Sequence, residues 1–297
     1  IKTIFAGTPS FSVPTLEYLL SRKDIDVLGV YTRPDKPKGR GRQLAYSKVK
    51  SYAIERKLNV FQPASFKEEK TIIKFQAFKA DLFIVAAYGI ILPTTIIEAA
   101  RNTINVHASL LPRWRGAAPI QRSIINGDRK TGISIMRIVE ELDAGPVINA
   151  IECKIEESDN CETLTRKLST LAPRALAITL QKIIDNKVTE SPQKLEKVTY
   201  AEKIKKNERT INWMESAEKI VRKIRALSPT PGASTKVKEL DLKIIDAQIT
   251  SSDSKDKVGD LFVSSDGFPA FYAGDKAVKI LKIKISGKNT ISGKDFY

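Results

Sequence analysis

The feature that most constrains the fold is an uninterrupted apolar run at residues 81–88, Asp-Leu-Phe-Ile-Val-Ala-Ala-Tyr. This run is too short to span a membrane, and no apolar run in the 297 residues reaches the necessary length. A short run without polar alternation is typical of a β-strand that is covered on both faces. Such strands belong to parallel sheets, so the run predicts a central strand with helices above and below the sheet.

Further strands and helices alternate along the first two thirds of the chain. The patterns predict strands at 2–6, 26–32, 103–107, 131–139 and 146–155. They predict helices at 47–57, 67–78 and 162–185. A further helix is expected after Ser12, which would cap it, with Pro14 in its first turn. This order predicts an α/β fold, a Rossmann-like mostly parallel sheet with helices on both faces. The turn Gly7-Thr8-Pro9 is not a dinucleotide fingerprint, and we expect it to be structural.

The composition of the chain changes after Asn186. Residues 187–208 are polar and charged, as in a linker. An amphipathic helix follows, with the apolar stripe Ala217, Ile220, Val221, Ile224 and Leu227. Short alternating runs at 242–249, 259–263, 270–272 and 277–285 then predict a small β-barrel or sandwich. We therefore expect a catalytic domain at 1–189, a linker at 190–208 and a C-terminal β domain at 209–297.

The net charge of +16 indicates an acidic partner, for which nucleic acid is the obvious candidate. A lysine-rich surface without a partner is the alternative, but the charge is uneven: residues 1–150 carry 23 basic against 13 acidic side chains, whereas residues 151–198 carry 8 of each. The N-terminus lacks a secretory pattern, and Cys153 and Cys161 lack metal-binding spacing. We expect a cytoplasmic protein with reduced thiols, no membrane span and no metal.

Asn105 and His107, the only histidine, lie on one face of a predicted strand, because strand side chains alternate. The following Ser-Leu-Leu-Pro ends the strand, so both side chains point beyond its carboxyl end, where open α/β sheets bind ligands. Asp143 sits in a Leu-Asp-Ala-Gly loop after the next strand and could meet them there. An amide, an imidazole and a carboxylate suit a reaction that stabilises an oxyanion and moves protons.

These residues resemble the folate-dependent formyltransferases, and within them the enzymes that act on aminoacylated initiator tRNA. The resemblance rests on Asn-x-His with Asp143, on Ser-Leu-Leu-Pro-x-x-x-Gly at 109–116, and on the narrower Arg-Trp-Arg-Gly-Ala-Ala-Pro-Ile-Gln-Arg at 113–122. The opening Phe-Ala-Gly-Thr-Pro and closing Gly-Lys-Asp-Phe also fit, so it covers essentially the whole chain. It implies catalysis by Asn105, His107 and Asp143, and an OB-like C-terminal barrel.

The resemblance also implies two binding surfaces. The co-substrate 10-formyltetrahydrofolate is expected against Ser109, Leu110, Leu111, Pro112, Tyr88, Gly89 and Leu92. Initiator methionyl-tRNA is expected at a basic loop after the second strand, through Arg33, Lys36, Lys38, Arg40 and Arg42. Two prolines, two glycines and many cations in this loop predict a segment without regular structure.

The implied reaction transfers a formyl group from the folate to the amine of methionine on initiator methionyl-tRNA, by an enzyme that is expected to be a monomer. One alternative is a formyltransferase of the same scaffold that acts on a sugar nucleotide or on glycinamide ribonucleotide; the basic loop argues against it. A non-catalytic RNA-binding module is the other alternative. Such a module has no use for Asn105, His107 and Asp143 together.

Overall fold

The structure is a computed structural model that describes residues 1–38, 43–251, 257–285 and 287–296. The chain forms two compact units. Unit 1 comprises residues 1–117, 131–153 and 165–200, and unit 2 comprises residues 118–130, 154–164 and 201–297. In the described part of the chain, no helix is both long and apolar enough to cross a membrane.

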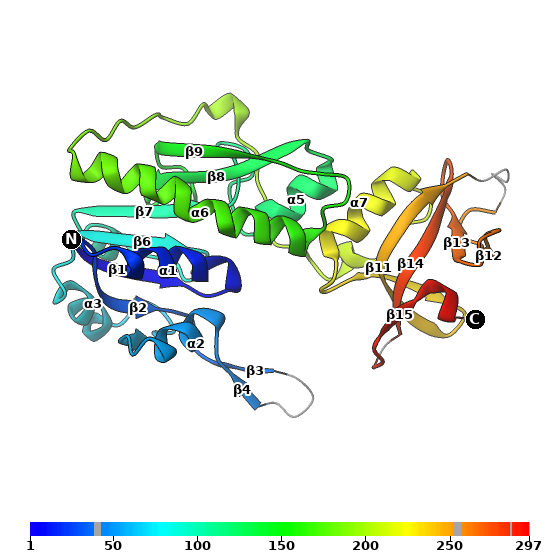
Figure 1. The fold of residues 1–297 in the computed structure, drawn as a ribbon, viewed down its shortest axis with the longest axis horizontal. Coiled ribbons are helices and arrows are strands. Elements are labelled where there is room, and N and C mark those ends of the chain that lie inside the picture. Colours follow the sequence, from blue (N-terminus) through cyan, green and yellow to red (C-terminus); the bar gives the residue numbers. More distant parts are fainter. Residues whose placement is uncertain (39–42, 252–256, 286, 297) are drawn as a thin grey trace. The chain divides into compact units, whose positions relative to one another are not determined.

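Unit 1 is built on a seven-stranded sheet with the strand order β5-β2-β1-β6-β7-β8-β9 (Figure 1). Its strands are β1 (Lys2–Gly7), β2 (Asp26–Tyr31), β5 (Val60–Phe61), β6 (Leu82–Ala86), β7 (Asn102–His107), β8 (Lys130–Arg137) and β9 (Val147–Lys154). The first five pair in parallel, and β8 runs antiparallel to β7. The predicted mostly parallel sheet is confirmed.

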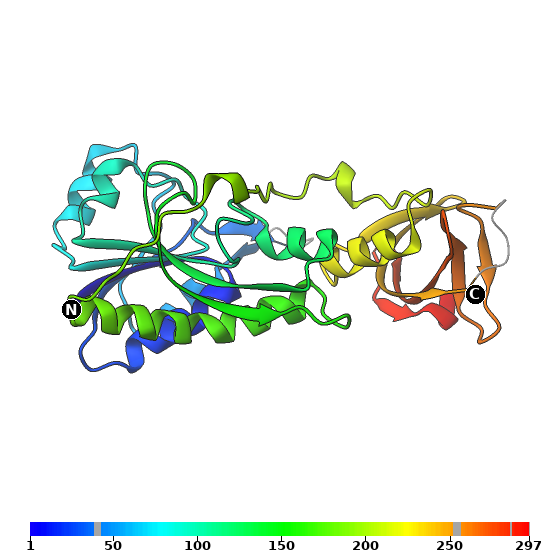
Figure 2. The same ribbon diagram turned by 90° about the horizontal axis from the view of Figure 1, so that it is seen from above.

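Helices lie on both faces of this sheet. In Figure 2 the green helix α6 lies on one side of the strands, and the cyan helices α3 and α4 lie on the other. The helices are α1 (Val13–Ser21), α2 (Lys48–Glu55), α3 (Glu69–Gln76), α4 (Thr94–Ile97) and α6 (Cys161–Ile184), which starts in unit 2. Double coverage explains why every residue of β6 is buried and why its sequence has no polar alternation.

One predicted helix cap is wrong. Ser12 precedes α1, but its hydroxyl does not bond to the helix. It donates instead to the carbonyl of Ala86 at 2.6 Å, and this bond ties the first turn to the end of β6. The need to satisfy a buried carbonyl at the sheet edge outweighs the capping preference of serine.

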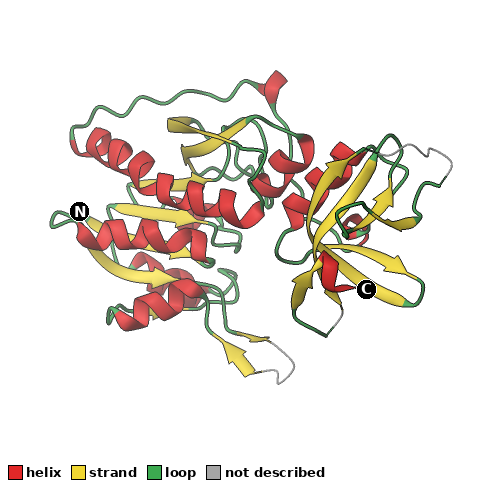
Figure 3. Ribbon diagram, turned by 45° about the vertical axis from the view of Figure 1, so that its right-hand side comes forward, coloured by secondary structure: helices red, strands yellow, loops and turns green. Residues whose placement is uncertain are grey.

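Unit 2 is a curled antiparallel sheet, a half-barrel, with helix α7 packed on it (Figure 3). Its strands are β10 (Ala233–Val237), β11 (Leu240–Thr250), β12 (Leu261–Val263), β13 (Pro269–Tyr272), β14 (Ala277–Ile285) and β15 (Thr290–Ser292). Helix α7 (Ala217–Leu227) buries Ala217, Ile220, Ile224 and Leu227 in the core of this unit, as its apolar stripe predicts. The small β domain predicted from the alternating runs is confirmed.

Two earlier segments of the chain join unit 2. Helix α5 (Pro119–Asn126) packs against α7, and the turn before α6 is held by Arg225 of α7. The Arg225 guanidinium donates to the carbonyls of Asp159 at 2.7 Å and Glu156 at 2.8 Å, and burial lowers its pKa. Unit 2 thus contains two segments that precede residue 189, which differs from a single division of the chain at that residue. The predicted boundaries of a catalytic domain, a linker and a C-terminal domain stay a prediction.

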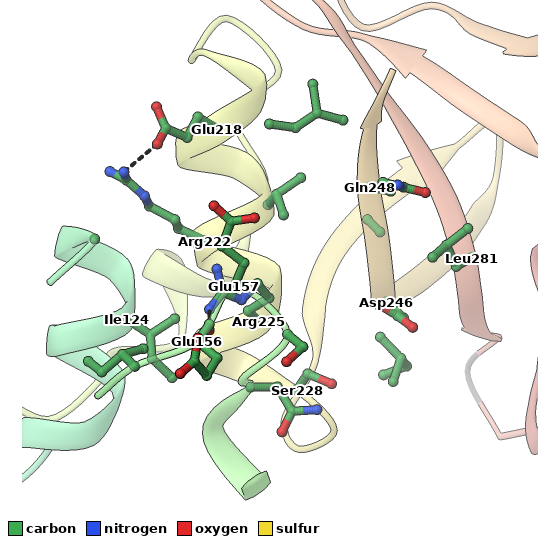
Figure 4. Close-up of a pocket in the computed structure, with 18 of the residues that line it drawn as sticks. Ile124, Glu156, Glu157, Glu218, Arg222, Arg225, Ser228, Asp246, Gln248 and Leu281 are labelled. Atoms are coloured by element: carbon green, nitrogen blue, oxygen red, sulfur yellow. Dashed lines mark hydrogen bonds and ion pairs between the residues drawn. The ribbon is translucent and has the colours of Figure 1, made fainter. Parts of the chain in front are cut away.

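A hollow of about 1150 Å³ lies within unit 2 beside these contacts. Figure 4 shows Arg222 and Arg225 reaching it from α7, with Glu157 and Asp246 among the acidic side chains that also line it. Positive and negative side chains are mixed in its lining, so the hollow is not a purely cationic surface for a phosphate backbone.

Candidate active site

The carboxyl end of β7 presents the two residues predicted from alternation. Asn105 and His107 are separated by one residue on the same strand, and His107 is only 5% exposed. β7 lies between β6, its parallel neighbour, and β8, which runs the other way. The strand therefore delivers an amide and an imidazole side by side at the sheet edge.

The structure brings Asp143 to the same place. The Asn105 side-chain nitrogen donates to Asp143 Oδ1 at 3.3 Å, and His107 Nδ1 lies 3.6 Å from Asp143 Oδ2. The backbone N–H of Gly116 donates to the same Oδ2 at 2.8 Å. Two hydrogen bonds and the adjacent imidazole thus fix the position of this carboxylate.

The other ring nitrogen of His107 is also engaged. Nε2 lies 2.9 Å from the backbone oxygen of Trp114, and because a carbonyl oxygen only accepts, Nε2 carries a proton. Trp114 holds a left-handed backbone conformation, with φ of 64°, that turns this carbonyl toward the ring. The Nδ1 atom of His107 faces the Asp143 carboxylate, so contacts on both sides fix the plane of the ring.

The segment after β7 forms a tight turn with its own internal bonds. Ser109 is buried, and its hydroxyl donates to the carbonyl of Arg113 at 2.5 Å. Ser134 of β8 donates to the Ser109 carbonyl and accepts from the N–H of Leu111. The side chains of Leu110, Leu111 and Pro112 are half-buried, whereas the Ser109 side chain is fully used within the turn.

The second predicted folate segment has a different character. Tyr88 is 2% exposed, its ring packs edge-on against Phe66, and burial raises the pKa of its phenol. Its hydroxyl has no hydrogen-bond partner among the described residues. Gly89 adopts φ of 78° beside the Arg33 side chain, and Leu92 is half-buried. The ring of Tyr88 thus belongs to the core, while Gly89 and Leu92 lie nearer the surface.

The basic loop contains regular structure that its composition did not predict. β3 (Lys36–Lys38) and β4 (Gln43–Ala45) form an antiparallel pair, so the expectation of an irregular segment is wrong for these arms. Asp35 anchors the stem through an ion pair with Lys50 and a bond from Gln62, and Lys50 holds the pKa of that carboxyl below its usual range. Local strand pairing and this anchor outweigh the turn-forming composition.

Three of the five predicted tRNA-contacting residues, Arg33, Lys36 and Lys38, lie in the described part of the chain. Arg33 and Lys36 have exposed side chains, and Lys38 lies at the end of β3. Arg40 and Arg42 lie outside the described residues.

Within the ranges described, no cluster of three or more His, Cys, Asp or Glu side chains could hold a metal ion.

Two residues near the site were not predicted from the sequence. Arg115 is 2% exposed and bonds to the side chains of Gln193 and Glu141. Gln193 in turn bonds to the backbone of the Asp143 loop. Arg115 stands in the quoted Arg-Trp-Arg-Gly run, but nothing in the local sequence marks Gln193, which lies in a polar stretch.

Comparisons with known proteins agree with this architecture. Residues 1–180 match the formyl transferase family and residues 203–297 match the formyl transferase C-terminal domain. The chain is 41% identical to the methionyl-tRNA formyltransferase of Methylococcus capsulatus, over 100% of this chain and 96% of the relative.

Solved structures share the fold at lower identity. The methionyl-tRNA formyltransferase of Clostridium thermocellum aligns with a TM-score of 0.60 and 16% identity over 99% of this chain and 100% of that one. An N-formyltransferase of Helicobacter canadensis, solved with folinic acid and dTDP-3-aminofucose, aligns with a TM-score of 0.68 and 18% identity over 94% and 98%.

Proposed function

Because the chain belongs to the formyl transferase family, we propose that it transfers the formyl group of 10-formyltetrahydrofolate to the α-amine of methionine on initiator methionyl-tRNA. The observation that carries the choice of substrate is the identity of 41% with a methionyl-tRNA formyltransferase over the full length of the chain. The convergence of Asn105, His107 and Asp143 at the sheet edge supports the chemistry.

The reaction begins with attack of the methionine amine on the formyl carbon, which gives a tetrahedral intermediate with a negative oxygen. Asn105 uses one amide hydrogen on Asp143 and has no other acceptor among the described residues, so the second hydrogen can serve the oxyanion. His107, whose Nδ1 lies 3.6 Å from the same carboxylate, is the second group that stabilises this oxygen. Donors fixed by the fold require no reorganisation when the charge develops.

Asp143 moves the protons in this proposal. The attacking nitrogen must lose a proton and N10 of the folate must gain one before the C–N10 bond breaks. A carboxylate between the two nitrogens can accept the first proton and supply the second, so the transfer is balanced without an outside reagent. Gly116 and Asn105 hold the carboxylate from two sides and leave it one orientation.

The binding surfaces follow from the same proposal. Ser109, Leu110, Leu111 and Pro112, with Tyr88, Gly89 and Leu92, form the folate walls, mainly through backbone groups where the side chain is buried, as in Ser109 and Tyr88. The basic-loop residues Arg33, Lys36, Lys38, Arg40 and Arg42 contact the acceptor end of the tRNA. We place the enzyme in the cytoplasm as a monomer with a catalytic domain at 1–189, a linker at 190–208 and a C-terminal domain at 209–297.

A substrate competition tests this function. The purified chain is given 10-formyltetrahydrofolate with methionyl initiator tRNA, methionyl elongator tRNA, an amino-sugar nucleotide or glycinamide ribonucleotide. Formylation is expected only with methionyl-tRNA, and faster with the initiator. Formylation of the amino-sugar nucleotide, with methionyl-tRNA untouched, would reject the assignment in favour of the sugar enzymes that share the fold.

A further inference from the structure

The loop that carries Asp143 has an unfavourable backbone. It joins β8 to β9, and Asp143 itself adopts φ of 49°, a left-handed conformation that residues other than glycine seldom hold. Gly145 lies so close to strand β8 that a Cβ there would stand 2.0 Å from the Arg137 carbonyl oxygen. A strained conformation persists only where its surroundings impose it, so the loop needs anchors.

Gln193 supplies two of these anchors. Its side-chain nitrogen donates to the backbone oxygen of Asp143 at 2.8 Å and to that of Gly145 at 2.7 Å. Both amide hydrogens are therefore used on the two residues that flank Ala144. The contact crosses about fifty residues of sequence, and the pairing of Ser191 with Val147 brings the segment to the loop.

Arg115 fixes the orientation of this amide. Its Nε donates to the Gln193 oxygen at 2.9 Å, and because a guanidinium cannot accept, the amide cannot be reversed without losing this bond. A terminal nitrogen of Arg115 also donates to Glu141 at 3.1 Å, earlier in the same loop. Arg115 is itself held by a backbone bond to Thr199 at 2.9 Å.

The contacts close into a ring around the carboxylate. Arg115 holds Gln193, Gln193 holds the backbone of Asp143, and the carboxylate of Asp143 accepts from Gly116, the neighbour of Arg115 in the chain. All of these residues belong to unit 1. The ring fixes both the backbone and the side chain of Asp143 relative to β7.

We infer that Gln193 is a positioning residue for the formyl transfer, which holds the Asp143 loop in its reactive conformation while Arg115 locks the Gln193 amide. The effect of Gln193 on the reaction rate rests on the proposed function, whereas its effect on the loop does not depend on the substrate. Neither residue reaches the reacting atoms, and both act through Asp143.

Steady-state kinetics with methionyl initiator tRNA test the rate effect. Gln193→Ala is expected to lower kcat about 10- to 100-fold, since a misplacement of about 1 Å can slow an enzyme by 10²-fold, with less than about a threefold change in either KM. Gln181→Ala is the control, because Gln181 is an exposed glutamine bonded only to nearby Asp185. Retention of more than half the wild-type kcat by Gln193→Ala overturns the inference.

Gln193→Glu gives a second test of the hydrogen-bonding role. Its carboxylate would face the two backbone oxygens, whereas the protonated acid can donate to one of them. Because Arg115 holds this carboxylate in its charged form, Gln193→Glu keeps the size of the side chain and the bond from Arg115 but cannot donate to the loop. Its kcat should therefore fall at least as far as that of Gln193→Ala, and a kcat for Gln193→Glu above half the wild-type value counts against the hydrogen-bonding role even if Gln193→Ala folds poorly.

Amide hydrogen exchange separates this inference from the proposed function. Residues 138–146 should exchange faster in Gln193→Ala than in wild type or Gln181→Ala, with the other strands of unit 1 unchanged. If the wild type fails to formylate methionyl-tRNA but the loop loosens in the variant, the function is wrong and the positioning role stands. Unchanged exchange in the loop rejects the positioning role whatever the substrate.

Discussion

Asp143 accepts hydrogen bonds from Asn105 and Gly116 and lies beside His107, which is bonded on its other side to Trp114. The three chemical groups are therefore bound mainly to one another and to the backbone. Such mutual bonding fixes their orientation before a substrate arrives, which is the condition for effective charge stabilisation.

Removal of one oxyanion donor gives the first prediction. His107→Ala and Asn105→Ala should each lower kcat by about 10²- to 10³-fold, as expected for the loss of one such donor. The Kd for methionyl-tRNA should stay within about twofold, because neither side chain belongs to the basic hairpin. Rapid-quench formylation and filter binding measure the two quantities. More than a tenth of wild-type turnover in His107→Ala would contradict the role.

Removal of the Tyr88 hydroxyl is expected to raise the stability of the protein. Its buried hydroxyl has no hydrogen-bond partner among the described residues, and an unsatisfied buried polar group costs about 1–3 kcal/mol. Tyr88→Phe removes the hydroxyl and keeps the ring packing, so the free energy of unfolding should rise by about 1 kcal/mol, with folate affinity unchanged. Denaturant unfolding and folate titration check this. A loss of stability would reveal a bond to the hydroxyl.

The placement of Asn105 and His107 follows from local geometry and can be predicted from the sequence, because the alternation of a strand puts them on one face. The loop that follows the neighbouring strand brings Asp143 beside both of them. The left-handed conformation of Asp143 and the reach of Gln193 come from contacts between segments about fifty residues apart. No local pattern encodes such contacts.

At the level of elements, most strands and the longer helices lie within a few residues of their predicted bounds. Helix α5 was not predicted, although Pro119 at its first turn and Gly127 in a left-handed conformation after its end are ordinary helix boundary signals. The hairpin arms β3 and β4 were missed because glycines and prolines suggest turns, whereas strand pairing and the Asp35 anchor decide the conformation.

The two hydrogen bonds from Arg225 to the turn before α6, called here the Arg225 clasp, give a prediction about stability. Arg225→Met removes two bonds from a charged donor to backbone carbonyls, together worth about 3–6 kcal/mol, but it also relieves the cost of burying the guanidinium, so the free energy of unfolding should fall by about 2–3 kcal/mol. Arg222→Met on the same helix is the control. It removes one partly exposed pair with Glu218, worth about 0.3–0.5 kcal/mol. Equal losses in the two variants would show that the clasp adds nothing.

For the whole molecule, the excess of positive charge determines how strongly tRNA binding depends on salt concentration. Binding of tRNA should weaken steeply as salt rises, and binding of 10-formyltetrahydrofolate, whose charge is confined to the carboxylates of its glutamate, far less. Lys36→Ala should reduce the slope of log K against log salt by about 0.9 if its exposed side chain contacts one phosphate. Lys23→Ala removes an exposed lysine at the opposite end of β2 and should leave the slope unchanged. Identical slopes for wild type and Lys36→Ala would exclude that contact.

The discontinuous make-up of unit 2 has a consequence for synthesis on the ribosome. Helix α5 packs on α7, yet residues 127–216 must be translated between them. At about 5–20 residues per second, roughly 5–18 s pass before the partner of α5 exists. During that interval the side of α5 that packs on α7 in the folded chain is not yet covered by α7. Slow translation of this stretch would lengthen that exposure, whereas slow translation after α7 would not.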